Sequence, residues 1–220
     1  MSVRIAVVSA GLSQPSSTRL LADQLAAATT AAVGDATLHE VGGGPEVVVD
    51  VVELRDHAHA LADHLLTGFA SGELAEAIGR VARADALIVV TPVFSASYSG
   101  LFKTFFDVLE PETLAGTPVL LAATAGTARH SLVLEHALRP LFAYLRAVTV
   151  PTAVFAATED FGDSTLAARV HRAAGELAAM VVGRGGGRLG ERRSAALPGP
   201  DEEFGEVVPF EALLRRSHEQ

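Results

Sequence analysis

The chain of 220 residues contains no cysteine and only one lysine, Lys103. Without cysteine, disulfide bonds, thiolate nucleophiles and cysteine-ligated metal sites are excluded. The net charge is −9 and the arginines are scattered along the chain. This charge pattern argues against a nucleic-acid-binding surface, which requires a basic face.

Long apolar runs are also missing. The longest, "ALIVV" and "TPVLLAATA", fall far short of the roughly 20 residues that a membrane-spanning helix needs. Residues 1–9 are too short for the core of a signal peptide. Hydrophobic residues nevertheless make up 49% of the chain, which is enough for one buried core. We therefore expect a soluble, cytoplasmic protein.

Short, β-branched apolar segments alternate along the chain with segments of helical periodicity. Buried strands are predicted at residues 3–8, 46–54, 86–94, 117–125 and 148–156. Helices are predicted from residue 17, over 56–84 with a break at 68–72, and over 99–109, 129–145 and 163–182. This alternation indicates a parallel sheet with right-handed crossovers. We expect a flavodoxin-like, doubly wound α/β fold, with five parallel strands in the order 2-1-3-4-5 and helices on both faces.

The composition changes after residue 182, where the Gly- and Arg-rich segment "GRGGGRLGERRSAALPGP" begins. We therefore expect residues 1–182 to form the domain and residues 183–220 a flexible linker and tail, with a short helix at 207–217. The linker contains "GGGRLG", which matches G-x-G-x-x-G only literally. The dinucleotide fingerprint requires a strand before it and a helix after it, and neither is predicted here.

Two further motifs have simpler structural explanations. "GDSTL" at residues 162–166 resembles an esterase nucleophile block, but Asp163 and Ser164 stand where a helix N-cap is expected. His57, His59 and His64 lie close together in sequence, yet no carboxylate completes a metal shell and no H-E-x-x-H motif occurs. We interpret the histidines as a solvated helix face and predict no metal site.

The turn "SAGLSQPSST" between the first strand and the first helix is rich in hydroxyl groups. The strand delivers Ser9 to the carboxyl edge of the sheet, where open α/β folds bind their ligands. A helix N-terminus follows and favours an anion. Ser16, Ser17 and Thr18 add hydroxyl donors. One serine could simply cap the helix, but so many hydroxyls exceed what a cap needs. The turn therefore predicts a phosphate site, and without a Walker lysine it does not predict nucleotide triphosphate hydrolysis.

A second stretch, "TPVFSASYSGLFKTFFDVL" at residues 91–109, leaves the third strand at the same edge. Pro92 is expected to stop the strand ladder. Phe94 and Tyr98 bring flat apolar surface into a serine-rich loop, which suits a planar ring system that forms hydrogen bonds. Alternatively, Phe94 plugs the core.

These two stretches resemble the NADPH-dependent FMN reductases of the flavodoxin-like superfamily, especially those that supply two-component monooxygenases of the alkanesulfonate and luciferase-like type. Residues 91–109 are similar to the family block T-P-V-Y-x-x-S-Y-S-G-x-L-K-x-x-x-D. Residues 121–142 are similar to the following loop and helix, including A-L-[KR]-P. The resemblance covers residues 3–182. It implies that the FMN phosphate is bound by Ser9, Ser16, Ser17 and Thr18. It also implies that the flavin ring is bound by Pro92, Val93, Phe94, Ser95, Tyr98, Thr124, Gly126 and Thr127.

The chain departs from the family pattern at four places. Many members carry an arginine near Leu12 or Ser13 and an asparagine at the position of Thr18, whereas this chain has no asparagine at all. Both departures predict a weaker hold on the phosphate. Phe94 replaces a common tyrosine and Ala125 a glycine, which predicts a changed hold on the ring.

The resemblance implies an NAD(P)H-dependent FMN reductase whose product, FMNH2, leaves for a partner luciferase-like flavin-dependent monooxygenase. FMN and NADPH are the expected cofactors, and a homodimer or homotetramer the expected assembly. No catalytic side chain is assigned, because hydride transfer needs aligned cofactors more than an acid or a base. Two alternatives remain. One is a quinone or azo reductase that retains FMN. The other is a non-enzymatic flavodoxin, although the acidic residues usual around its ring are absent from 94–99 and 124–128.

The predicted helix over residues 129–145 contains Pro140, which has no N–H to donate to the carbonyl of His136. Such positions favour kinks and π-bulges. Leu134, Leu138, Leu141 and Leu145 are expected to cover the sheet. We predict a distorted turn around His136 and hypothesise that it meets a second copy of the chain.

Overall fold

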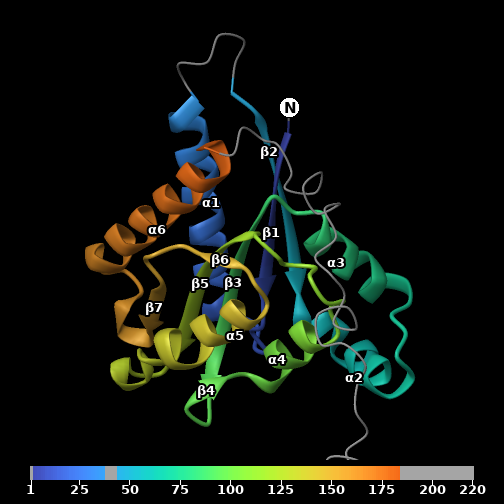
Figure 1. Cartoon of the computed structure of the whole chain (residues 1–220). Helices are drawn as coiled ribbons and strands as arrows, with labels where there is room; N and C mark the ends of the chain where they lie inside the picture. Colours follow the sequence, from blue (N-terminus) through green and yellow to red (C-terminus); the bar gives the residue numbers. More distant parts are fainter. Residues whose placement is uncertain (1, 38–43, 184–220) are drawn as a thin grey trace, which may run out of the picture. The chain divides into compact units, whose positions relative to one another are not determined.

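A parallel sheet forms the centre of the protein, for which a computed structural model describes residues 2–37 and 44–183. The strand order is β2-β1-β3-β5-β6, with β7 also beside β5 (Figure 1). The expected flavodoxin-like order is thus confirmed, with the fifth position divided between two short strands. The parallel strands are β1 (Ser2–Ser9), β2 (Glu46–Glu53), β3 (Ala86–Phe94), β5 (Pro118–Ala125), β6 (Val148–Thr149) and β7 (Val154–Ala157).

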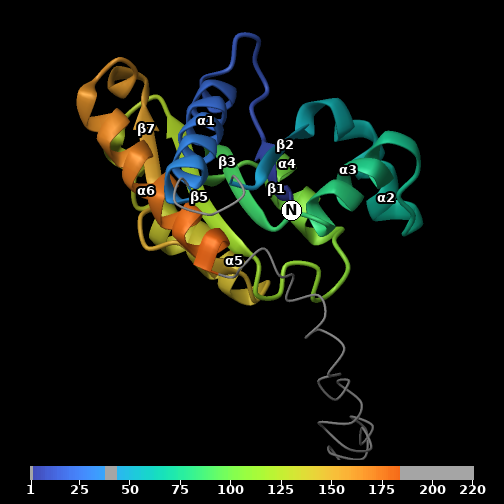
Figure 2. The ribbon, with the colours of Figure 1, turned by 90° about the horizontal axis from the view of Figure 1, so that it is seen from above.

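Helices cover both faces of the sheet, as expected. One face packs against α1 (Ser17–Thr37) and α6 (Ser164–Gly183), and these helices lie together on one side in Figure 2. Alternate strand residues point to opposite faces, so Ile5 and Val7 face α1 and α6 while Ala6 and Val8 face the other layer. That layer consists of η1 (Leu54–His57), α2 (Ala58–Thr67), α3 (Gly72–Ala82), α4 (Gly100–Asp107) and α5 (Arg139–Tyr144).

The predicted break between residues 68 and 72 is confirmed: α2 ends at Gly68, which adopts a left-handed conformation with φ of 76°. None of the helices formed by residues 2–37 and 44–183 combines the length and apolar character needed to cross a membrane. The described part of the chain ends at residue 183. The rest of the predicted linker and the helix predicted at 207–217 therefore lie outside it.

The single fifth strand predicted over residues 148–156 is wrong. Val150 still donates its N–H to the Val119 carbonyl at 3.0 Å, but the ladder then stops at Pro151, which has no N–H. Both the backbone N–H and the hydroxyl of Thr152 bind the Glu176 carboxylate of α6, at 2.7 and 2.6 Å. The segment between β6 and β7 is therefore held by α6 instead of by the sheet.

The expectation that Pro92 stops the strand ladder is confirmed for the parallel pairing with β5, which ends at Pro92, but not for the strand itself. Pro92 is paired in register with Thr124 of β5, and the chain continues to Phe94. It then folds back as a hairpin on β4 (Ser97–Tyr98). Losing one N–H donor does not end β3, because the antiparallel pairing with β4 follows at once.

The distorted turn predicted around His136 is confirmed. In place of one regular helix, a short 3₁₀ turn η2 (Ala128–His130) precedes the π-helix η3 (Leu134–Leu138), which runs directly into α5. Leu134 and Leu138 are buried as expected, but Leu141 and Leu145 are only partly buried, and Phe142 takes the fully buried position beside them. His136 and Leu132 are exposed.

Candidate functional site

Ser9 ends β1 at the carboxyl edge of the sheet, between Glu53 of β2 and Val90 of β3. The side chain is fully buried, and its hydroxyl oxygen has no hydrogen-bond partner among the described residues. Buried hydroxyl groups in folded proteins are almost always hydrogen-bonded. An orphaned hydroxyl directly below the β1–α1 loop (residues 10–16) therefore indicates a place where a ligand or water completes the bonding.

The β1–α1 loop is packed closely on the first turn of α1 at Gly11. A Cβ atom at this position would collide with the Ser16 hydroxyl and approach Thr18 Cβ to 3.1 Å. Ser16 itself accepts a hydrogen bond from the Arg19 N–H at 3.2 Å, so it caps α1. The capping alternative is therefore confirmed for Ser16, whereas Ser17 is exposed.

Thr18 and Thr124 connect the β1–α1 loop to the end of β5. Their hydroxyl oxygens lie 2.8 Å apart, and both side chains are buried. Either hydroxyl could be the donor, and the accepting one keeps its own proton for a further bond. Thr18 is thus not simply aimed into the loop, as its position in the sequence suggested. It links the two parts of the candidate site.

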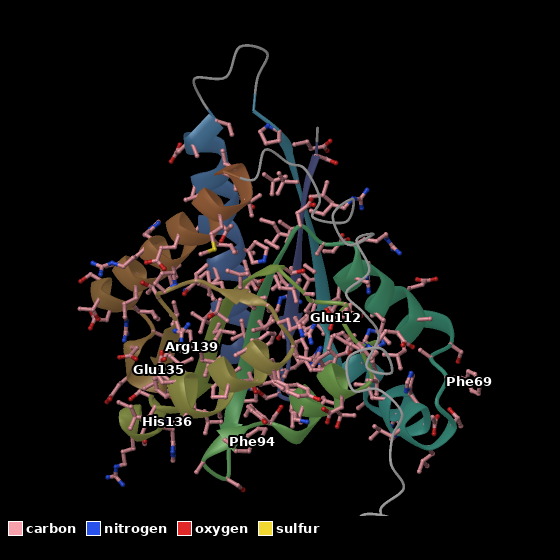
Figure 3. All side chains as sticks on the ribbon, viewed as in Figure 1. Phe69, Phe94, Glu112, Glu135, His136 and Arg139 are labelled. Carbon is pink, nitrogen blue, oxygen red and sulfur yellow. The ribbon has the colours of Figure 1, made fainter. Side chains whose placement is uncertain are left out.

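The second part of the site lies where β3 and β5 end side by side. Because Pro92 pairs with Thr124, the β3–β4 hairpin and the loop at 126–127 leave the same edge of the sheet as neighbours. Phe94 is 48% exposed on this hairpin, so the alternative that it plugs the core is wrong. Phe94 and His136 both lie along the lower edge of the ribbon in Figure 3. Tyr98 is half-buried, with its ring centroid 5.9 Å from that of Phe102.

Hydroxyl groups fix the base of the β3–β4 hairpin. The N–H of Ser99 donates to the Thr91 hydroxyl at 3.1 Å, and that hydroxyl donates to the Pro92 carbonyl at 3.0 Å. Ser99 in turn caps α4 by accepting from the Phe102 N–H at 3.2 Å. The hairpin tip is held differently, because Ser95 and Ala96 both have positive φ, 49° and 66°. Positive φ at both residues of a two-residue hairpin loop matches a type I′ turn, in which glycine or asparagine is usual, so serine and alanine here carry backbone strain.

The remaining predicted ring-binding residues form the open side of this edge. Pro92 and Val93 are half-buried, and Gly126 and Thr127 are exposed. Nothing lies within 4 Å of the place a Cβ would take at Gly126. Residues 94–99 and 124–128 contain no acidic side chain. This arrangement leaves an uncharged, accessible strip with backbone groups and one exposed aromatic ring.

Arg55 is a residue that reasoning from the sequence missed. It lies in η1 immediately after β2, and its Nη1 is 3.5 Å from the carbonyl oxygen of Ser13 in the β1–α1 loop. The available signal was its position, because β2 runs parallel to β1 and therefore ends at the same edge of the sheet.

The motifs given structural explanations were mostly interpreted correctly. Asp163 caps α6 by accepting from the Thr165 N–H at 2.9 Å. That backbone hydrogen bond, together with the Thr165 and Ser164 hydroxyls, lowers the pKa of Asp163. The solvated face proposed for the histidines is wrong for His57, which is 7% exposed, although His59 is exposed. Within residues 2–37 and 44–183, no group of side chains is arranged to hold a metal ion.

The sequence model of the NADPH-dependent FMN reductases matches residues 3–162 of this chain. The chain belongs to this family. It is 38% identical over 186 residues to an FMN reductase (NADPH) of Pseudomonas aeruginosa, which covers 82% of this chain and 94% of the relative. It is also 38% identical over 186 residues to the NADH-dependent FMN reductase SfnF of Pseudomonas fluorescens, with 82% and 92% covered. An oxidoreductase structure from Corynebacterium diphtheriae superposes with a TM-score of 0.77 at 49% identity, covering 83% of this chain and 98% of that one.

The residues present fit the flavin that this family uses. A phosphate needs donors and close backbone approach, which the orphaned Ser9 hydroxyl, the glycine at position 11 and the N-terminus of α1 offer. A flavin ring needs a flat, apolar and hydrogen-bonding surface, which the β3–β4 hairpin and Gly126 offer. Both requirements are met along one edge of the sheet.

Proposed function

We propose that this FMN reductase family member reduces FMN with NAD(P)H and releases FMNH2 to a separate, luciferase-like flavin-dependent monooxygenase. The observation that carries the proposal is the pairing of Pro92 with Thr124. This pairing brings the β3–β4 hairpin beside the loop at residues 126–127, with Thr18 joining both to the β1–α1 loop. A site with a hydroxyl-rich loop at one end and an exposed aromatic ring at the other suits a phosphate and a flavin ring.

Two groups of residues divide the work of binding. At the phosphate end, the Ser9 and Ser17 hydroxyls and the backbone around Gly11 and Ser16 donate to the anion, and Thr18 stabilises this end from below. At the ring end, the flavin is held by Pro92, Val93, Phe94, Ser95, Tyr98, Thr124, Gly126 and Thr127.

The bound flavin supplies the hydride-accepting ring, so the protein itself needs no proton-transferring side chain. The chain's part is to align the two cofactors and to place backbone N–H groups near the ring. The hairpin tip at Ser95 and Ala96 and the exposed Gly126 present such groups without a competing carboxylate.

The open ring end supports flavin exchange in preference to permanent retention. Phe94, Ser95, Gly126 and Thr127 are all exposed, so this part of the sheet edge is open. A ring that leaves its site without protein unfolding can carry its electrons to another protein. We place the reaction in the cytoplasm, where reduced nicotinamide is available.

The decisive experiment measures NADPH and NADH oxidation with free FMN as the only acceptor. The rate should rise with FMN concentration until it saturates, and the protein should purify largely without flavin. Mixing the reduced reaction with a flavin-dependent monooxygenase should transfer FMNH2 at a rate set by flavin dissociation. Purification with stoichiometric FMN, with a rate raised by quinones but not by added flavin, would instead establish a flavin-retaining quinone or azo reductase. Binding of FMN without any nicotinamide oxidation would establish an electron-transfer flavodoxin.

We further propose that the chain assembles as a homodimer or homotetramer through the surface around the π-helix. Leu132 before the π-helix is 64% exposed, and Tyr144 at the end of α5 is 85% exposed, although both have large hydrophobic side chains. A contiguous exposed apolar patch marks an interface, and we propose that both side chains contribute to one. Light scattering of the wild type and of Leu132→Glu tests the assembly, and an unchanged mass for the variant would exclude Leu132 from the interface.

A further inference from the structure

The β1–α1 loop contains no charged side chain of its own. Residues 9–18 include hydroxyls, an amide and a proline but neither an acid nor a base. A phosphate monoester is a dianion near neutral pH, and the neutral donors of the loop with the N-terminal dipole of α1 compensate only part of that charge. A cation is therefore expected from a neighbouring element.

Arg55 reaches this loop from the adjacent strand. Ser9 of β1 pairs with Glu53 of β2, so the two strands end together and η1 begins beside the loop. Arg55 Nη1 lies 3.5 Å from the Ser13 carbonyl oxygen. In the amide orientation that satisfies both groups, the Gln14 side-chain oxygen accepts from Nη1 at 2.9 Å and also from Nη2. The guanidinium is thus fixed against the loop.

The charge of Arg55 is only partly neutralised by its surroundings. Its buried Nε forms no hydrogen bond among the described residues, but it lies 3.4 Å from Asp56 Oδ1, in an ion pair with a carboxylate that is 61% exposed. Glu53, the last residue of β2, is bound to Arg19 at 2.5 Å. Arg19 also binds Asp23, at 2.7 Å, so it is committed to two acids. Of the two arginines beside the loop, Arg19 has two carboxylate partners and Arg55 has one exposed partner, so the charge of Arg55 is the less fully compensated.

We propose that Arg55 is the cationic binding residue for a phosphate monoester at the β1–α1 loop, supplied from η1 instead of from the loop itself. A guanidinium suits this role, because its planar set of donors matches phosphate oxygens and its charge is never lost near neutral pH. The inference rests on the proposed function. It also revises the expectation that the loop holds its phosphate with neutral donors only.

Two phosphate monoesters occur in the proposed reaction, the 5′-phosphate of FMN and the 2′-phosphate of NADPH. FMN and riboflavin differ only in the first, and NADPH and NADH only in the second. The first source is therefore tested without any turnover by titrating the flavin-free full chain with FMN and with riboflavin. Quenching of flavin fluorescence reports the binding of each. The ratio of kcat/KM for NADPH and NADH tests the second.

Arg55→Gln should reduce one of these two preferences by about tenfold or more, as expected for a lost hydrogen bond to a charged group. Arg55→Lys should restore part of that preference, and the wild-type preference should weaken with added salt. Loss of the FMN preference assigns Arg55 to FMN, and loss of the NADPH preference assigns it to NADPH. Arg172→Gln is the matched control, because Arg172 is an exposed arginine on α6 outside the site.

Gln14→Ala distinguishes the effect of the Arg55 charge on the ligand from the effect of Arg55 on the conformation of the loop. This variant removes the side chain that Arg55 binds but keeps the guanidinium, so it should retain the phosphate preference. The proposal is overturned if Gln14→Ala reproduces the full loss seen in Arg55→Gln, or if Arg55→Gln weakens FMN and riboflavin equally. Unchanged preferences in Arg55→Gln also overturn it, while the reductase function stands. If the wild type itself neither prefers FMN to riboflavin nor oxidises a nicotinamide, the function proposed above has failed, and this inference with it.

Discussion

The β1–α1 loop and the β3–β4 hairpin lie at the same edge of the sheet but are held in different ways. The loop is fixed by Arg55 from η1, by close packing of Gly11 on Ser16 and Thr18, and by the Thr18–Thr124 hydrogen bond at its end. The hairpin is fixed at its base, while its tip at Ser95 and Ala96 is exposed and strained. The difference indicates a firm phosphate end and an adaptable ring end. This combination suits a ligand that must be recognised and then released.

The largest effect is expected at the firm end, from Gly11→Ala. The added methyl group collides with the Ser16 hydroxyl and lies close to Thr18. Because the contacting groups belong to the capped turn of α1, the loop must move, at a cost of about 2–3 kcal/mol. Urea unfolding and FMN titration should both show the loss. Gly175→Ala in α6 is the control, since its Cβ would meet nothing within 4 Å and alanine favours a helix. An FMN affinity equal to wild type in Gly11→Ala would remove the claim of a tightly packed loop.

The connection between the two ends is tested by a double-mutant cycle on Thr18 and Thr124. Thr18→Val leaves the Thr124 hydroxyl buried without its partner, which should cost about 1–2 kcal/mol of unfolding free energy. Adding Thr124→Val removes the orphaned hydroxyl, so the double variant should be less destabilised than the sum of the single ones. Strict additivity in urea unfolding would show that the two hydroxyls do not interact. FMN titration of the same variants then reports whether the remaining hydroxyl proton contributes to binding.

At the adaptable end, Ala96→Gly should stabilise the protein by about 1 kcal/mol. Ala96 has φ of 66°, and the left-handed conformation costs a non-glycine residue roughly this amount. Ala168→Gly in α6 is the matched control and should have the opposite sign, because Ala168 is exposed within that helix and glycine destabilises a helix interior. Thermal unfolding distinguishes the two. A loss of stability in both variants would mean that the hairpin tip is not strained.

The smallest effect is expected outside both regions, at the ion pair between Glu135 and Arg139. The hydrogen bond from Arg139, with an N···O distance of 2.7 Å, lowers the pKa of Glu135. A carboxyl group with a lowered pKa stabilises the fold above its unfolded-state value, about 4.3. That stability is lost as the pH falls through the folded-state value. Because Glu135 is 52% exposed, Glu135→Gln should cost no more than about 0.5 kcal/mol at pH 7. Unfolding curves of the two proteins should converge in acid, and a constant difference from pH 7 to pH 3 would contradict this account.

Hydrophobic periodicity was sufficient to predict the sheet. The parallel strands are nearly continuous apolar runs, and β3 was predicted with its observed bounds, Ala86–Phe94. The two prolines near strand ends had different outcomes, since a proline removes a single donor and its neighbours decide the rest. At Pro92 the following hairpin continues the pairing, whereas near Pro151 a carboxylate from α6 takes the chain out of the sheet. Glu176 lies 24 positions from Thr152 in sequence, whereas β4 follows β3 directly as the second strand of a hairpin.

The candidate site was predicted where local chemistry determines it and missed where tertiary contacts do. Ser16 could be identified as a possible cap because capping involves residues only three positions apart. The bond of Thr18 with Thr124 spans 106 positions, and the contact of Arg55 with Ser13 spans 42. Such contacts follow only from the strand order. Once the order 2-1-3 is accepted, however, a cation just after the second strand becomes a reasonable candidate for the phosphate loop.

The division of the fifth strand has a consequence for the outer border of the sheet. Long, regular border strands offer an unbroken row of unpaired backbone groups, to which a strand of another molecule can add. Here β6 contributes two residues and β7 four. Between them, Pro151 has no N–H to offer, and the N–H of Thr152 is taken up by Glu176. A foreign strand would find no more than a few consecutive groups to pair with. The same interruption that shortens the sheet therefore protects this border from strand addition and from the aggregation that it starts.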